Sequence, residues 1–159
     1  MKMTMDLKNL QGVDQMLKQL PKEVVSNQRG GMVALSMRKG SNVIKDEIKR
    51  RLIQSIDDGT TGTLVKALRV KRGEAPNSGK GERFLVNFKR VSYPRKQGQK
   101  RAATTLQVMN LKEYGSSHQN AEPIIRPGFE ATAPKAITTI SNDLVSRVDK
   151  AAQKHLKKA

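Results

Sequence analysis

The stretch that decides the fold is residues 63–91, TLVKALRVKRGEAPNSGKGERFLVNFKRV, in which two partly apolar runs flank a turn-rich segment. In the second run, Phe84, Val86 and Phe88 alternate with other residues, which is typical of a strand with one buried face. Gly, Pro, Asn and Ser gather between the runs and favour a loop. The pattern predicts a β-hairpin with strands over 63–72 and 83–91 and a loop over 73–81.

Helices are predicted on both sides of this hairpin. Apolar residues recur at intervals of three and four, a spacing that places them on one helix face. The segments concerned are 5–20, a long one over about 32–56 and a final one over about 134–156. Pro134 suits the first turn of the final helix. We therefore expect a single α+β domain, in which a small antiparallel β-sheet packs against the long central helix and the C-terminal helix.

Two further segments complete the prediction. Residues 93–101 are basic and rich in turn formers, so we expect an exposed loop within a basic region over 63–103. Residues 106–114 fit either a strand or a short helix.

The composition predicts a thin core and excludes several classes of site. Aromatic residues make up 3% of the 159 residues, so burial at subunit interfaces is expected to supplement the core. The absence of Cys removes disulfides and thiolate chemistry, and the two His residues have no acid at a metal-ligand spacing. We expect no enzyme activity, no metal and no cofactor. No stretch reaches the ~20 apolar residues of a membrane span, so we expect a soluble protein without membrane contact.

Positive charge is concentrated in the middle of the chain. The formal net charge is +17, and residues 59–112 hold 13 basic and 2 acidic residues, a local excess of +11. This excess predicts contact with nucleic acid or with an acidic protein surface, against the alternative of a merely solvated face. The candidate contact residues are Lys66, Arg69, Lys71, Arg72, Lys89, Arg90, Arg95, Lys96, Lys100 and Arg101.

A block near the C-terminus carries a resemblance. Glu113-Tyr114-Gly115-Ser116 is followed by a second segment, residues 122–130, EPIIRPGFE. This order resembles the signature of the neck or tail-completion proteins of long-tailed bacteriophages, also described as minor head–tail joining proteins. Their signature is a Glu-aromatic-Gly-Thr turn, then a Pro-Phe-Leu-Arg-Pro-Ala block and a closing helix. Upstream, residues 61–64 resemble the family element that links the long helix to the first strand. The matching family positions are Glu113, Tyr114, Gly115, Pro123, Arg126 and Pro127.

These residues also make physical sense. Pro123 and Pro127 restrict the backbone on both sides of Arg126, and we expect Arg126 to pair with Glu113 or Glu122, within the subunit or across an interface.

The resemblance implies a structural virion protein, assembled in the host cytoplasm, that forms a ring at the neck or tail. A ring of six copies is expected, with twelve as the alternative. Its partners would be its own copies, adjacent neck, head-closure or tail-tube proteins, and genomic DNA in the channel. Two other functions stay open. One is a tail terminator that caps the tail tube, and the other is a basic protein that binds nucleic acid without sequence specificity.

Overall fold

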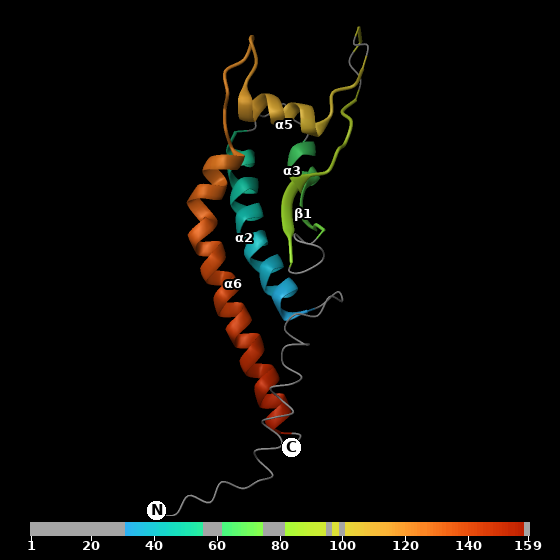
Figure 1. Ribbon diagram of the computed structural model, residues 1–159. Coiled ribbons are helices and arrows are strands. Elements are labelled where there is room, and N and C mark those ends of the chain that lie inside the picture. Colours follow the sequence, from blue (N-terminus) through green and yellow to red (C-terminus); the bar gives the residue numbers. More distant parts are fainter. Residues whose placement is uncertain (1–30, 56–61, 75–81, 95–96, 99–100, 158–159) are drawn as a thin grey trace, which may run out of the picture.

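Helix α2 (Met32–Gln54) runs through the middle of the fold, with a second long helix on one side and a β-hairpin on the other (Figure 1). The computed structural model describes residues 31–55, 62–74, 82–94, 97–98 and 101–157. The predicted helix over 5–20 lies outside these residues. The prediction of an α+β fold with a two-stranded antiparallel sheet is confirmed. None of the helices in the described part of the chain has the length and apolar content that a membrane crossing requires.

Helix α6 (Ile125–Leu156) lies antiparallel along α2. The two helices approach closely at Gly40, where a Cβ atom would come within 2.9 Å of the carbonyl oxygen of Ala136. A second close contact lies nearer the start of α6, where Gly128 meets Ile48. Gly40 lowers helix propensity, yet this crossing requires it, because any side chain there would force the helices apart.

A carboxylate fixes the register of this helix pair. Asp143 of α6 accepts hydrogen bonds from Ser36 Oγ (2.9 Å) and Lys39 Nζ (2.7 Å) of α2, and from Arg147 Nε (2.6 Å) one turn further along α6. Ser36 is fully buried. The bonds from Lys39 and Arg147 hold the pKa of the Asp143 carboxyl well below its usual value.

The hairpin consists of β1 (Leu68–Arg72) and β2 (Phe84–Phe88) and packs on the other side of α2. Leu68 pairs with Phe88 and Val70 with Val86, so these side chains share one face of the sheet. Leu68 and Phe88 join the buried core with Leu52, whose side chain is fully enclosed. The predicted alternation of Phe84, Val86 and Phe88 is thereby confirmed.

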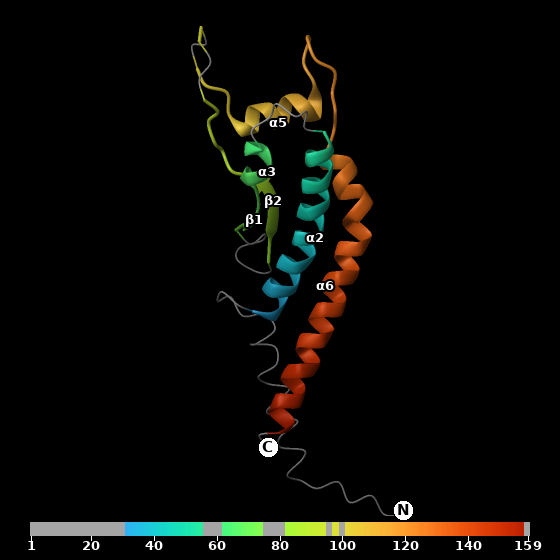
Figure 2. The same ribbon diagram turned by 180° about the vertical axis from the view of Figure 1, so that it is seen from behind.

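Helix α5 (Thr105–Tyr114) crosses one end of the molecule, and the segments that flank it project beyond it (Figures 1 and 2). Thr104 and Gln107 form a capping box at its start. The buried Thr105 hydroxyl donates to the carbonyl oxygen of Lys89 (2.6 Å) and accepts from the N–H of Val91 (3.1 Å). These bonds attach the start of α5 to the chain that leaves β2.

Two predicted elements differ from the structure, and the structure decides between the two alternatives left open for a third. Residues 63–67, expected as strand, form the short helix α3 (Thr63–Ala67), because Leu64 and Ala67 meet the core at helical spacing. The ambiguous segment 106–114 belongs to helix α5. The C-terminal helix begins at Ile125, nine residues before the expected Pro134, which lies inside α6.

Candidate functional site

The two parts of the C-terminal block meet at the buried side chain of Glu113, which is 6% exposed. Its Oε2 accepts hydrogen bonds from the N–H groups of Ile124 and Ile125, both at 2.9 Å, and its Oε1 accepts from that of Arg126 at 3.1 Å. These are N–H groups at the start of α6, where the helix itself offers no acceptor. Glu113, at the end of α5, therefore acts as the N-terminal cap of a helix that begins twelve residues later.

The environment of Glu113 keeps the carboxyl charged. Burial acts to raise its pKa, but the three backbone hydrogen bonds and the nearby Arg126 outweigh burial, so the pKa lies below its usual value. Backbone N–H groups occupy both oxygens. This carboxylate is built to accept fixed hydrogen bonds, and it is poorly suited to taking up a proton from a substrate.

Of the two carboxylates expected to pair with Arg126, the structure selects Glu113 of the same subunit. The Arg126 Nε lies 3.7 Å from Glu113 Oε1, and the guanidinium stacks 5.3 Å from the centre of the Tyr114 ring. Tyr114 is 68% exposed. Stacked Arg and Tyr side chains that remain accessible are the residue types most enriched at protein interfaces.

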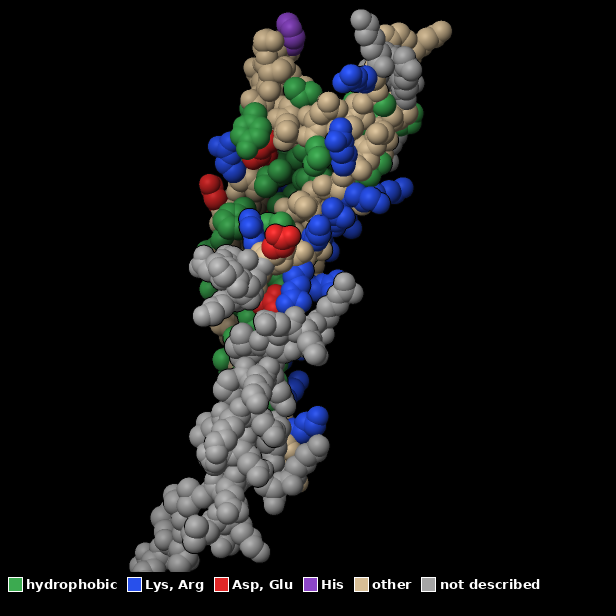
Figure 3. Space-filling view, turned by 45° about the vertical axis from the view of Figure 1, so that its right-hand side comes forward, with side chains coloured by type: hydrophobic (Ala, Val, Ile, Leu, Met, Phe, Trp, Pro, Cys, Tyr) green, Lys and Arg blue, Asp and Glu red, His purple; other side chains and the backbone are tan. Residues whose placement is uncertain are grey.

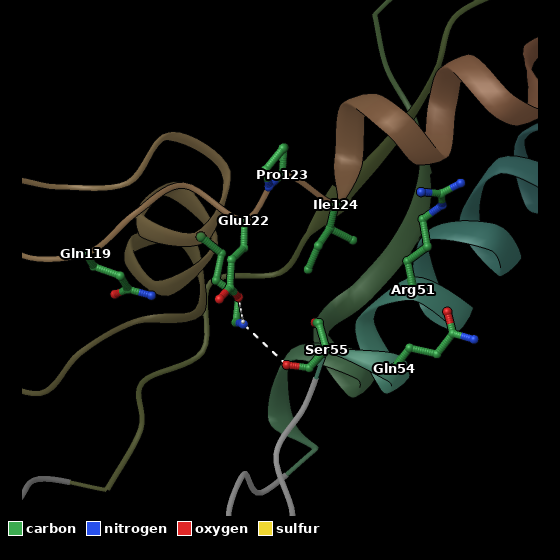
Figure 4. A pocket seen from close by; sticks show the side chains of 8 residues that line it. Arg51, Gln54, Ser55, Gln119, Glu122, Pro123 and Ile124 are labelled. Carbon is green, nitrogen blue, oxygen red and sulfur yellow. Dashed lines mark hydrogen bonds and ion pairs between the residues drawn. The ribbon is translucent and has the colours of Figure 1, made fainter.

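Glu122 pairs instead with Lys112, at 3.3 Å. The Lys112 ammonium also donates to the carbonyl oxygen of Ser55 at 3.4 Å, at the C-terminal end of α2, where a cation is favoured by the helix dipole. A polar pocket of about 640 Å³ lies here, with Gln54 on one wall and Gln119 on the other (Figure 4). The pocket joins the end of α2 to the projecting loop, and the Lys112–Glu122 ion pair forms part of its lining.

Gly115 ends α5 in a conformation that only glycine adopts readily, with φ 73° and ψ −170°. A Cβ atom there would also lie 2.8 Å from both the carbonyl oxygen of Gln119 and the N–H nitrogen of Ala121. Ser116 and Gln119 then exchange backbone hydrogen bonds of 2.8 and 3.3 Å across the loop tip. The glycine of the block is thus required for the tight return that brings the chain back to Glu113.

The two prolines of the block have different surroundings. Pro123 lies just before α6, and Pro127 lies in its first turn, where a missing N–H removes no helical bond. Ile124 is buried in the core. Phe129, which follows in the first turns of α6, is 52% exposed.

The basic candidate residues divide into three groups. Arg72 is half-buried and pairs with Glu82, while Arg95, Lys96 and Lys100 lie outside the described residues. The remaining cations are exposed and, within the described part of the chain, form no ion pair. They are Lys66 of α3, Arg69 and Lys71 of β1, Lys89 and Arg90 just after β2, and Arg101 before α5.

Sequence reasoning missed a set of exposed apolar side chains. On α5, Leu106, Leu111 and Tyr114 face outward. On α6, Ile137 and Val145 are 64% and 59% exposed, because α2 covers only part of an apolar surface that extends around the helix. The sequence signal was the distribution of apolar residues around the last helix. They cover a wider part of the helix circumference than contact with one neighbouring helix requires.

No cluster of three His, Asp or Glu side chains within the described ranges is arranged to hold a metal ion. Comparison with protein-family models, with curated proteins and with solved structures finds no match to this chain.

Proposed function

We propose that this protein is a ring-forming structural subunit of the neck or tail of a long-tailed bacteriophage, of the tail-completion type. The observation that carries the proposal is the Glu113 cap. The resemblance rests on two short motifs. The cap joins them, because Glu113 of the first motif accepts hydrogen bonds from the backbone of the second motif, where the long α6 helix starts. Motifs that act together in this way support the resemblance better than either motif alone.

The exposed apolar side chains support assembly with other copies. A chain with a thin core that leaves Tyr114, Phe129, Ile137 and Val145 more than half exposed gains stability when a neighbour covers them. Two different apolar faces, one on α5 and one on α6, also suit a head-to-tail contact, in which each subunit presents unlike surfaces to its two neighbours. Contacts of this type close into rings.

In this function the protein performs no covalent step. The α2–α6 pair would form the rigid body of each subunit, and the α5 end would dock on an adjacent neck, head-closure or tail-tube protein. The assembled ring would join head to tail in the virion and let genomic DNA pass. Assembly would take place in the host cytoplasm.

The test is the mass and shape of the purified protein. Light scattering coupled to size-exclusion chromatography at high salt should give six copies, or twelve, and electron microscopy should show rings. The variant Ile137→Asp/Val145→Asp should remain folded and lose the ring. The matched control Thr138→Asp/Ser146→Asp adds the same charge on the polar face of α6 and should keep it. A monomer at all concentrations and salt conditions would contradict the proposal.

A second function is favoured by the exposed cations of the hairpin, which form no ion pair within the described residues: that of a free basic protein that binds nucleic acid. It predicts a monomer whose DNA affinity falls steeply as salt rises. A tail terminator would also form a ring, and it would co-sediment with isolated tail tubes rather than with heads.

A further inference from the structure

One face of the hairpin points away from α2. Along this face, each of four successive cross-strand residue pairs, here called rows, contains one Lys or Arg side chain. The strand register places Arg69 and Lys71 in neighbouring rows of this face. Just beyond the strands, the Lys89 N–H donates to the Ala67 carbonyl oxygen (2.8 Å), and the Gly73 N–H donates to the Arg83 carbonyl oxygen (2.9 Å). These bonds extend the strand pairing by one residue pair at each end. Since alternate residues of a strand point to the same side, all four cations share this face.

These four side chains are free to bind a ligand. All are exposed, and within the described residues none of them forms an ion pair. The carboxylate of Glu82, next to Arg83, is already engaged by Arg72. Arg69 uses its Nε to reach Asn87 Oδ1 at 3.2 Å, which leaves its terminal N–H groups available. Lys and Arg side chains follow one another along this side of the molecule in Figure 3.

The spacing of the row suits a continuous polyanion. Its four rows cover six residues of strand, about 20 Å at about 3.3 Å per residue. Duplex DNA carries one negative charge per about 1.7 Å of its axis. A row of this length therefore lies opposite several phosphate groups, whatever the base sequence of the DNA. The face carries no aromatic side chain between Arg83 and Lys89 or between Arg69 and Lys71, as stacking on single strands would require.

We propose that this row, Arg83, Lys71, Arg69 and Lys89, binds the phosphate backbone of duplex DNA without reading its sequence. The inference goes beyond the proposed ring, because a single subunit presents the complete row. In a ring, it would bring the row of every copy to the same DNA.

The experiment is a fluorescence-anisotropy titration of the full chain with a labelled 30-base-pair duplex of mixed sequence, at several salt concentrations. Four phosphate contacts predict a slope of log affinity against log salt of about −3.6, or a loss of about 150-fold between 50 and 200 mM salt. The variant Arg69→Gln/Lys71→Gln should reduce the slope by about 2, so the same salt change costs only about 12-fold. The variant Arg83→Gln/Lys89→Gln should do the same and serves if the first variant does not fold.

The matched control is Lys150→Gln/Lys154→Gln, which removes the same charge from exposed positions on α6. It should leave the slope near that of the natural chain. An equal loss in hairpin and control variants would show that net charge alone attracts DNA, and it would overturn the inference. So would tighter binding to polyglutamate than to the duplex, which would point to an acidic protein as the partner. The oligomeric state, measured separately, decides the proposed ring and leaves this result unaffected.

Discussion

Removing the charge of Glu113 should detach the start of α6 from α5. In Glu113→Gln the side chain keeps its shape, but an NH₂ group replaces one oxygen and must face a backbone N–H group that donated to it. The helix start also loses a negative charge, which contributes up to ~2 kcal/mol in partly buried positions. We expect a loss of about 1–3 kcal/mol in the free energy of unfolding.

The substitution Glu113→Ala should cost more. It leaves the N–H groups of Ile124, Ile125 and Arg126 without their acceptor. An unsatisfied buried donor costs about 1–3 kcal/mol, and water entering the emptied space recovers part of this, so the expected loss is about 3–5 kcal/mol. Urea unfolding at one fixed protein concentration measures both variants without a contribution from altered assembly.

The effect of Glu113→Gln should depend on pH in a defined direction. Because the pKa of Glu113 is lowered on folding, its carboxylate stabilises the protein above the ordinary value of about 4.3. This contribution is lost as pH falls through the lower pKa of the folded state. The natural chain and the variant should therefore differ fully at neutral pH and converge in acid.

The control is Glu122→Gln, which neutralises the more exposed carboxylate in the same turn and should change stability by less than about 1 kcal/mol. Equal stability of Glu113→Gln and Glu122→Gln at neutral pH would refute the assignment of Glu113 as the helix cap.

Three further substitutions test the packing. Gly40→Ala should destabilise by about 1–3 kcal/mol despite better helix propensity, because its Cβ meets the Ala136 carbonyl oxygen; a higher urea midpoint would contradict the close crossing. Gly115→Ala should cost about 1–3 kcal/mol through its backbone conformation, and hydrogen exchange should show faster opening at Glu122, whose N–H donates to the Lys112 carbonyl oxygen, whereas unchanged exchange would argue against a strained turn. Leu52→Ala should lose about 2–5 kcal/mol by thermal unfolding, since its side chain is fully buried; a loss below 1 kcal/mol would place it outside the core.

Much of the fold could be predicted from the sequence because its elements follow strong local patterns. Helix α2 repeats its apolar stripe over more than six turns, and Phe84, Val86 and Phe88 recur at every second position of β2. Helix α3 was missed because it has only five residues, and the four-residue spacing of Leu64 and Leu68 fits either period. Tertiary contacts, not local preference, decide whether such a segment forms a helix or a strand.

The start of α6 could not be found by local rules. Its cap comes from Glu113, which belongs to another helix, so no capping residue stands directly before Ile125. Pro134 was the natural candidate for a first turn, yet proline inside a helix is tolerated where the carbonyl it leaves free can reach water. Glu130, whose carbonyl would otherwise accept the missing bond, is exposed, as is Pro134 itself.

The two-part block at residues 113–116 and 122–130 could be singled out from its residue order, while the surfaces around it could not. Charge along the sequence limited the partner of Arg126 to Glu113 or Glu122, and only the fold selects Glu113. The exposed faces of α5 and α6 depend on which side of each helix α2 and the core cover, and this is a property of the assembled fold.

The way α6 is attached explains why one of its faces remains open. Small residues such as Gly40 and Ala136 let α2 and α6 approach closely, but they provide little shape to fix the register. Asp143 supplies that register through its bonds to α2 near the middle of α6, while Glu113 of α5 holds the start of α6. Because these contacts are directional, α6 needs only a narrow apolar strip toward α2 to be held in place. The apolar residues beyond that strip, Ile137 above all, therefore stay exposed.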